Sequence, residues 1–373
     1  MALFDENVTL VPAPRRRLPR GAVAGIWSLV VALVVLLVLT FLPTAYVIQQ
    51  PGPVYDTLGT ARTGDGEEVP LISVEGAETY PTAGTLDLLT VQVRGNREHP
   101  ISWFELALAW FDRTRAVVPI DEVFPAGQTT EQRNEESSAM MVDSQQEATA
   151  AALSELGYDV GAQLTVYSLT DDSAASGAVE TGDVIVAVEG RSVADASEVR
   201  AIVAERAGEP VTLTVEREGT ARDVTVTPRE EEADGETVWL LGVTLMQEYD
   251  FPLDITIQLD NVGGPSAGMM FALGIMDVLT PGELNGGADV AGTGTITGTG
   301  DIGPIGGIRQ KMWGAEDAGA DIFLAPAANC GEVVGYIPDG LQVFAVTTLD
   351  DALEVLETVR DDGDLTALAS CES

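Results

Sequence analysis

Two residues of this 373-residue sequence, Ser266 and Lys311, have side chains that can carry out nucleophilic chemistry together. Ser266 stands in a Gly-rich turn between DITIQL (254–259), whose alternation predicts a strand, and MMFALGIMDVLT (269–280), which predicts a helix. A turn at the head of a helix exposes a side-chain oxygen beside unpaired backbone N–H groups, and these can stabilise an oxyanion. An ordinary N-cap serine or a tight turn fits the same position, so the turn alone leaves both interpretations open.

A serine hydroxyl needs a base before it can attack a carbonyl, and this chain offers few. Lys311 is the only lysine among 19 lysines and arginines, and His99 is the only histidine. Arginine does not lose its proton, whereas burial can lower the pKa of a lysine from about 10.4 to about 5–6. A desolvated Lys311 would therefore accept the serine proton; the alternative is a single surface lysine. His99, in a loop before Pro100, is expected to be ordinary surface.

The two segments together resemble the proteolytic domain of the Lon protease family, over about residues 240–345. The serine motif of the family appears as Gly264-Pro265-Ser266-Ala267-Gly268, and its second block as AGTGTITGTGDIGPIGGIRQK, which ends on Lys311. The resemblance implies that Ser266 and Lys311 form a catalytic dyad, with Gly264 and Ala267 supporting the serine loop. It also implies that Thr293 lies close to the lysine amine and orients it.

One position departs from the pattern of that family. Many Lon proteases have an acidic residue just before Gly-Pro-Ser, and this chain has Gly263 there. The departure affects the conformation that we expect for the serine loop in an inactive state, and it does not affect the assignment of the dyad.

The sequence predicts no metal and no cofactor. Zinc sites built on several histidines are excluded, and the chain has no CxxC pair. Gly298, Gly300 and Gly303 fit a dinucleotide fingerprint, with Asp321 further on, but Pro304 follows where a helix should open. The chain contains no GxxxxGK[ST] phosphate-binding loop either, so we expect proteolysis without ATP.

A second resemblance covers about residues 157–229, whose order of elements is similar to a PDZ domain. The strand QLTVYSL (163–169), the segment GDVIVAVEG, a helix over 196–208 and a hairpin around Glu218-Gly219 carry it. PDZ domains bind an extended peptide as an added strand. The resemblance places this groove between the strand at 163–169 and the helix, with Val160, Gly161, Ala162 and Leu164 as binding residues. The alternative is a module that only spaces its neighbours.

Residues 22–42 are uncharged and long enough to span a bilayer as a helix. Arg15, Arg16, Arg17 and Arg20 stand just before them, and positive residues stay on the cytoplasmic side. We therefore expect a cytoplasmic N-terminus and domains outside the membrane after about residue 43. A cleaved signal peptide is the alternative, although its apolar core is usually shorter.

The chain is strongly acidic, with 59 acidic residues against 19 basic ones and a formal net charge of −40. Such a surface repels phosphate backbones, so nucleic acid is not expected as a partner. Cys330 and Cys371 are the only cysteines; outside a membrane they could form a disulfide, and otherwise they are two unrelated thiols.

These features predict an α+β chain with an N-terminal transmembrane helix, a PDZ domain and a Lon-type proteolytic domain. The predicted limits are 1–20 for a cytoplasmic tail, 21–43 for the membrane helix, 44–141 for an extracytoplasmic region, 142–229 for the PDZ domain with a leading helix, 237–362 for the proteolytic domain and 363–373 for a tail.

The order of these domains resembles bacterial membrane-anchored PDZ–Lon endopeptidases. It implies an ATP-independent serine endopeptidase acting on exported or membrane-associated proteins or peptides, and suggests a homo-oligomeric ring. The alternative is a non-catalytic PDZ scaffold that binds exported protein tails.

Overall fold

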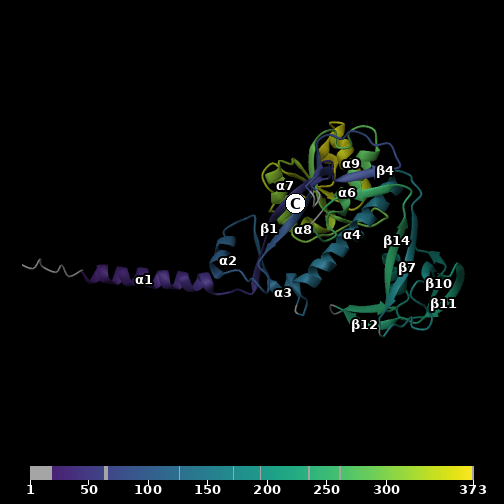
Figure 1. Ribbon diagram of the computed structural model, residues 1–373, viewed down its shortest axis with the longest axis horizontal. Coiled ribbons are helices and arrows are strands. Elements are labelled where there is room, and N and C mark those ends of the chain that lie inside the picture. The colour runs from purple at the N-terminus through teal and green to yellow at the C-terminus, as the bar shows by residue number, and fades with distance from the viewer. Residues whose placement is uncertain are drawn as a thin grey trace, which may run out of the picture. The chain divides into compact units, whose positions relative to one another are not determined.

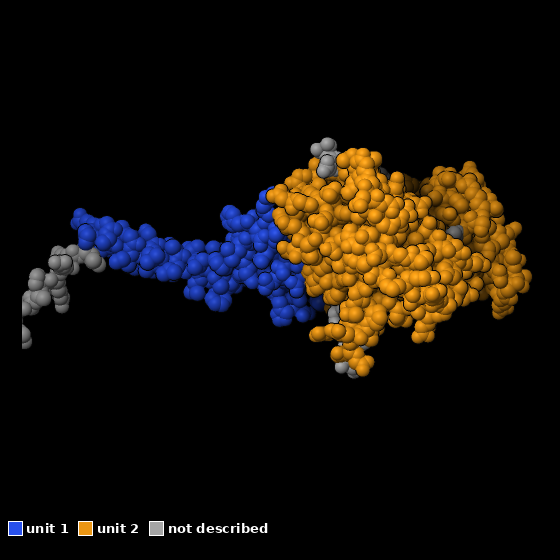
Figure 2. Space-filling view, turned by 90° about the horizontal axis from the view of Figure 1, so that it is seen from above, with its two compact units in different colours: residues 1–51, 92–130 blue, residues 52–91, 131–373 orange. Residues whose placement is uncertain are grey.

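A computed structural model of the chain describes residues 19–62, 66–125, 127–170, 172–193, 195–233, 236–259 and 262–371. The predicted cytoplasmic tail therefore lies almost entirely outside the described residues. The chain divides into two compact units, residues 1–51 with 92–130 and residues 52–91 with 131–373 (Figure 2). Helices and strands are mixed throughout, which confirms the α+β class (Figure 1).

The first unit begins with the long helix α1 (Arg20–Phe41), which is apolar on all sides and has no buried residue. Only α1, among the described residues, is long and apolar enough to cross a membrane. The short helices α2 (Trp103–Ala109) and α3 (Ile120–Val123) flank strand β6 (Ala116–Pro119). The first part of β1 (Tyr46–Asp56) pairs with β6 in antiparallel register.

The second unit is built on a sheet in which β5 (Thr85–Arg94), β16 (Asp289–Gly292), β19 (Ile322–Pro326) and β20 (Gln342–Val346) run parallel. Every residue of β19 is buried, as expected for a central strand covered on both faces. The helices α6 (Gly268–Leu279), α7 (Ile308–Ala318) and α9 (Leu349–Arg360) accompany this sheet. All ten residues from Gly268 to Asp277 are buried, so α6 is the central helix of the core.

The region 44–141, where the sequence pattern was weakest, supplies part of this core. β5 pairs with β16, and β4 (Ile72–Glu75) pairs with β15 (Asp254–Ile257), the strand that leads to the serine turn. Leu71, Leu86 and Leu88 lie fully buried in the cluster that contains α6. The predicted strand before Ser266 is thus present, over Asp254–Ile257.

A separate core holds the PDZ-like module. Its sheet has the order β11-β10-β8-β7-β14, formed by β11 (Thr220–Val226), β10 (Val211–Arg217), β8 (Val184–Val188), β7 (Gly161–Leu169) and β14 (Val243–Asp250). β9 (Arg191–Ser192) pairs with β8, and α5 (Ala196–Glu205) buries Val199, Ile202 and Val203 against the sheet. The predicted hairpin is confirmed: β10 and β11 meet at Glu218 and Gly219, whose φ angles are 50° and 73°. A two-residue hairpin turn of type I′ requires positive φ at both of its central residues.

Helix α4 (Thr130–Glu155) starts well before the helix predicted from residue 142. Its buried residues Met141, Ala148, Ala151 and Ala152 belong to the cluster built around α6, not to the core of the PDZ-like module. Val243 and Leu245 of β14, conversely, pack against the PDZ-like core although they lie beyond residue 237. The domain limits proposed from the sequence stay a prediction.

The remaining elements are short: β2 (Thr60–Arg62), β3 (Glu68–Pro70), β12 (Arg229–Ala233), β13 (Glu236–Leu240), β17 (Thr295–Ile296), β18 (Ile302–Gly303), η1 (Ala327–Asn329), α8 (Cys330–Val333) and η2 (Leu365–Ala367).

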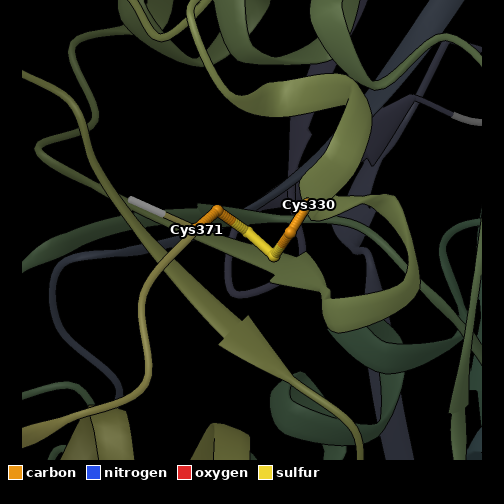
Figure 3. The surroundings of a disulfide bond; sticks show 2 residues. All are labelled: Cys330 and Cys371. Atoms are coloured by element: carbon orange, nitrogen blue, oxygen red, sulfur yellow. A yellow bond between two sulfur atoms is a disulfide. The ribbon is translucent and has the colours of Figure 1, made fainter. Parts of the chain in front are cut away.

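Cys330 and Cys371 form a disulfide, with 5.0 Å between their Cα atoms (Figure 3). The C-terminal segment before Cys371 lies along β20, where Ala345 donates its backbone N–H to Ala369 and Cys371 donates to Val343. Of the two alternatives that the sequence left open, the structure therefore has the disulfide, and it fastens the end of the chain to the central sheet.

Candidate active site

The hydroxyl of Ser266 is not used to cap the following helix. α6 begins at Gly268 with Ala267 as its N-cap, and no side chain caps it. The Oγ atom of Ser266 instead lies 2.7 Å from the Nζ atom of Lys311. The N-cap interpretation of Ser266 is therefore wrong.

Lys311, the fourth residue of α7, contacts Ser266 from the first turn of that helix. Only 2% of the residue is exposed, and its Nζ also donates to Thr293 Oγ1 at 2.8 Å. Burial lowers the pKa of Lys311 to about 7, because the charged amine would lose its hydration without gaining a counter-ion. Among the described residues no carboxylate forms an ion pair with it. The neutral amine, which can act as a base, is therefore well populated near neutral pH.

Thr293 fixes the direction of that amine. Its hydroxyl donates to the backbone carbonyl of Ser266 at 2.9 Å, so its oxygen is left to accept from Lys311. With one amine N–H directed at Thr293, the lone pair of a neutral Lys311 is free to face Ser266 Oγ. The structure thus brings together the three side chains that the resemblance grouped, from a turn, a strand end and a helix.

The two peptide groups on either side of Ser266 are held by their carbonyl oxygens. The carbonyl of Pro265 accepts from Ser144 Oγ at 2.9 Å, and that of Ser266 accepts from the backbone N–H of Gly294 at 3.0 Å as well as from Thr293. In a trans peptide the N–H points opposite to the C=O. The N–H groups of Ser266 and Ala267 are therefore aimed away from these anchors, and neither donates to any described residue.

Ser144, which lies 121 residues before the carbonyl that it holds, was not predicted from the sequence. It is 3% exposed and sits on α4, so its contact with the serine turn depends on tertiary packing. A small polar residue in the mostly apolar buried stripe of α4 is the local sign that could have drawn attention to it, although Thr149 of the same stripe shares this sign.

Helix α4 also accounts for the unusual Gly263. The backbone carbonyl of Ser137 in α4 accepts from the N–H of Gly264 at 2.8 Å. A Cβ atom at position 263 would lie 3.0 Å from Ser137 Cβ and 3.2 Å from its backbone carbon, closer than such atoms normally approach. There is no room here for the acidic side chain that many Lon proteases carry, because α4 occupies that space. Gly264 itself has φ of 87°, which favours glycine.

A groove of about 490 Å³ runs beside this turn. α4 forms one wall, and residues 257–259 with 262–263 form the other. The lining is mixed: Met141, Val142, Leu259 and Val262 are apolar, whereas Asn134, Ser137, Ser138, Gln145 and Gln258 are polar. The groove ends three residues before Ser266.

A half-buried carboxylate joins α4 to two other segments. Glu147 accepts from the hydroxyl of Tyr249, at the end of β14, at 2.9 Å, and also from the backbone N–H of Gly298. Burial raises the pKa of Glu147, and the two hydrogen bonds partly oppose that rise. Gly298 belongs to the segment that starts at Thr293, so Glu147 connects the last strand of the PDZ-like sheet with the segment beside the dyad.

The glycines that fit a dinucleotide fingerprint, Gly298, Gly300 and Gly303, do not have the structure of a nucleotide site. Residues 297–301 form the turn of a small hairpin between β17 and β18 rather than a strand-to-helix turn. No group of three or more histidine, cysteine, aspartate or glutamate side chains that could hold a metal ion occurs in the part of the chain that the structure describes. His99 is exposed in a loop, and its backbone N–H donates to the side chain of Asn96.

The predicted peptide groove does not lie where the sequence placed it. Gly161, Ala162 and Leu164 belong to β7 and Val160 directly precedes it, but β7 pairs with β8 on one side and with β14 along its whole length on the other. A peptide could add to β7 only by displacing β14. Among the described strands, β14 is the outermost strand of the sheet on the side of α5; it follows Leu241 and Gly242, and Gly242 has φ of 73°. That part of the prediction is wrong, because the missing strand comes after the hairpin β12–β13.

The comparisons with known proteins agree with the two modules. Residues 260–358 match the Lon protease (S16) C-terminal proteolytic domain, and residues 130–227 match the PDZ domain family. A solved PDZ domain of an SdrC-like protein from Listeria monocytogenes covers 22% of this chain and 85% of its own, with 19% identity and a TM-score of 0.20.

Curated relatives cover the C-terminal part. The chain is 35% identical over 112 residues to a Lon protease of Campylobacter concisus, or 29% of this chain and 14% of that protein. Lon protease 1 of Sorangium cellulosum is 38% identical over 111 residues, 29% of this chain and 13% of the relative. An archaeal Lon protease of Methanothermobacter thermautotrophicus is 33% identical over 113 residues, 30% of this chain and 17% of the relative. The chain thus spans only a small fraction of the length of these relatives.

Proposed function

We propose that this chain, which carries a proteolytic domain of the Lon family and a PDZ domain, is a membrane-anchored serine endopeptidase that works without ATP. Ser266 is the nucleophile and Lys311 the general base. The single observation that carries the proposal is the 2.7 Å contact between Ser266 Oγ and the Nζ of a fully buried lysine that has no carboxylate partner among the described residues.

In the first half of the reaction, neutral Lys311 takes the proton of Ser266 as the serine oxygen attacks the scissile carbonyl. The N–H groups of Ser266 and Ala267 face the oxyanion, since Ser144, Thr293 and Gly294 hold the carbonyls behind them. Protonated Lys311 then gives its proton to the leaving amine, the carbon–nitrogen bond breaks, and an acyl-enzyme ester on Ser266 remains.

In the second half, water enters where the amine has left. Lys311, neutral again, takes a proton from that water as it attacks the ester. The tetrahedral intermediate collapses, the acid product leaves, and the proton returns from Lys311 to Ser266. Thr293 keeps the amine directed at the serine through both halves, because its own hydroxyl proton is committed to the Ser266 carbonyl.

The PDZ domain supplies substrate recognition in this proposal. A peptide tail would add as a strand to the free edge of β14 and lie beside α5. The segment Leu240–Gly242 precedes β14 and would offer backbone N–H groups to a terminal carboxylate, in the place that the sequence prediction gave to Val160–Ala162. The partly buried Val243 and Leu245 on β14 favour an apolar side chain at the end of the tail.

α1 and the disulfide support the proposed anchor and location. α1 has a mean hydropathy of 2.9 over its most apolar window, and arginines precede it, which favours a cytoplasmic N-terminus and domains outside the cytoplasm. Compartments outside the cytoplasm are oxidising, and a disulfide such as Cys330–Cys371 persists there. The substrates would then be exported or membrane-associated proteins or peptides.

The proposal is tested with the purified full chain and an unfolded protein such as casein, in the absence of ATP. We expect cleavage by the parent protein and none by Ser266→Ala or Lys311→Ala. If both variants cleave as well as the parent, the dyad is wrong. If the parent itself is inactive but binds peptide tails, the alternative of a non-catalytic scaffold replaces the proposal.

A further inference from the structure

Helix α2 of the first unit presents apolar side chains on both of its faces. Leu106 and Ala109 are buried against Ile48 and Ile101, and they hold the helix in place. The other face and the residues that follow it remain exposed: Phe104 by 40%, Leu108 by 54%, Trp110 by 66% and Phe111 by 90%. We call these four residues the α2 aromatic face. An exposed apolar patch of this kind marks an interaction surface.

The position of α2 in the chain's path indicates what covers this face. The backbone N–H of Thr44, just after α1, donates to the carbonyl of Ile101, just before α2, at 3.1 Å. Pro43 and Ser102 form a β-bridge beside it. α1 and α2 therefore approach each other closely, as Figure 1 also shows. The aromatic face lies next to the end of the helix that is suited to span a bilayer, where Phe41 is 78% exposed.

The residue types suit the boundary between hydrocarbon and water. Tryptophan and other aromatic side chains gather at the headgroup level of membranes, where a flat apolar ring can lie beside polar groups. Arg113, two residues after Phe111, is exposed and forms no ion pair with a described residue, so its guanidinium is available to a lipid phosphate. Glu105, the acidic residue of α2, is turned back to the N-terminus of the helix in a capping box with Ser102.

We propose that the α2 aromatic face lies in the headgroup layer of the membrane that α1 spans and forms a second, interfacial anchor. The proposal rests on the membrane anchor of the proposed function. A lipid surface is favoured over a second copy of the chain because the face continues the apolar surface of α1 itself. Burial of apolar side chains, rather than charge, drives the contact, since a chain with a net charge of −40 is repelled by anionic lipids.

The test uses the full chain inserted in vesicles of phosphatidylcholine with phosphatidylglycerol. Phe111→Cys is labelled with an environment-sensitive fluorophore; the two native cysteines are joined in the disulfide and do not react. Tyr167→Cys, which replaces an aromatic residue of β7 that is 59% exposed, is the matched control. Each label is quenched in turn by iodide in the water and by lipids that carry a nitroxide near the headgroup.

We expect the label at position 111 to be protected from iodide and strongly quenched by the nitroxide lipid, and the label at position 167 to show the opposite. A label at 111 that iodide quenches as well as it quenches the label at 167 overturns the inference. So does a label at 111 that both quenchers miss while the unlabelled Phe111→Cys variant forms disulfide-linked dimers on oxidation, because the face is then an interface between copies. Extraction of the vesicles at alkaline pH separates the two proposals: a chain that washes off contradicts the anchor of the proposed function itself.

Discussion

The proposed catalytic centre around Ser266 and the outer edge of β14 differ in how firmly neighbouring groups hold them. At the centre, Lys311 and Thr293 are buried, and both carbonyls that flank the serine accept hydrogen bonds from other segments. β14 pairs with β7 along one edge and is the outermost strand of its sheet among the described strands, and its side chains alternate between partly buried and exposed. Groups that must meet within hydrogen-bond distance are fixed from several directions, whereas a strand that receives a partner keeps one side open.

Among the substitutions that test this difference, removal of the dyad should have the largest effect on activity. Ser266→Ala and Lys311→Arg should each lower kcat by about 10⁴-fold or more, as losses of a nucleophile or its base do in other serine proteases. Lys311→Arg keeps the charge but cannot act as a base, so it should be as inactive as Lys311→Ala. Casein hydrolysis measures the effect, and a Lys311→Arg variant with substantial activity would show that Lys311 acts only as a positive charge.

A smaller loss tests whether the serine turn depends on α4. Ser144→Ala removes the hydroxyl that holds the Pro265 carbonyl, so the N–H of Ser266 becomes less well directed. We expect kcat to fall by about 10–100-fold, less than when an oxyanion donor itself is lost, with little change in KM. Ser154→Ala, an exposed serine of the same helix, is the matched control and should leave kcat unchanged. Equal kcat in both variants would contradict the positioning role of Ser144.

The open edge should respond to a ligand rather than to catalytic substitutions. Adding a peptide with an apolar C-terminal residue should slow amide exchange in residues 243–250 and leave residues 161–169 unchanged, since β7 is already paired on both sides. KM for substrates with such a tail should be a few-fold lower than for the same substrates with a charged tail, while kcat stays the same. Protection that appears only in β7 would return the groove to its sequence-predicted place.

The disulfide offers a change that should leave both regions working. Replacing Cys330 and Cys371 by alanine opens a loop between residues 41 positions apart. The chain-entropy account then predicts a loss of about 3–4 kcal/mol in the free energy of unfolding, with kcat and peptide binding nearly unchanged at low temperature. Chemical denaturation measures the loss. A drop in kcat larger than that of Ser144→Ala would mean that the C-terminal segment also shapes the catalytic centre.

The difference between the dyad and the edge of β14 also explains which features could be predicted from the sequence. Ser266, Thr293 and Lys311 could be grouped from the scarcity of other bases and from the family pattern, since a dyad needs particular residue types at particular places. The support from Ser144 and Ser137 could not, because a helix more than a hundred residues away meets the turn only after folding. The groove was misplaced for a related reason: β14 comes after a separate hairpin, and the alternation of residues 243–250 does not reveal which sheet the strand joins.

The burial of Lys311 also predicts how stability depends on pH. Its pKa is lowered in the folded chain to about 7, from an ordinary value near 10.5. Between these two values the unfolded chain binds the proton that the folded chain has lost, so the contribution of Lys311 to stability rises with pH in that window. Lys311→Met should therefore be more stable than the parent at pH 7, and this advantage should shrink by pH 10. Denaturation at the two pH values checks it, and a constant difference would contradict a depressed pKa.

The central claim, that neutral Lys311 activates Ser266, is tested most directly by the rate at which an activated ester acylates Ser266 at different pH values. Mass spectrometry of the acyl-enzyme at short times gives the rate for the parent and for Lys311→Met. We predict that the parent rate rises with pH around a midpoint of about 7, the pKa to which burial lowers Lys311, and that the rise is absent in Lys311→Met. The same midpoint and the same rate in Lys311→Met would contradict the account.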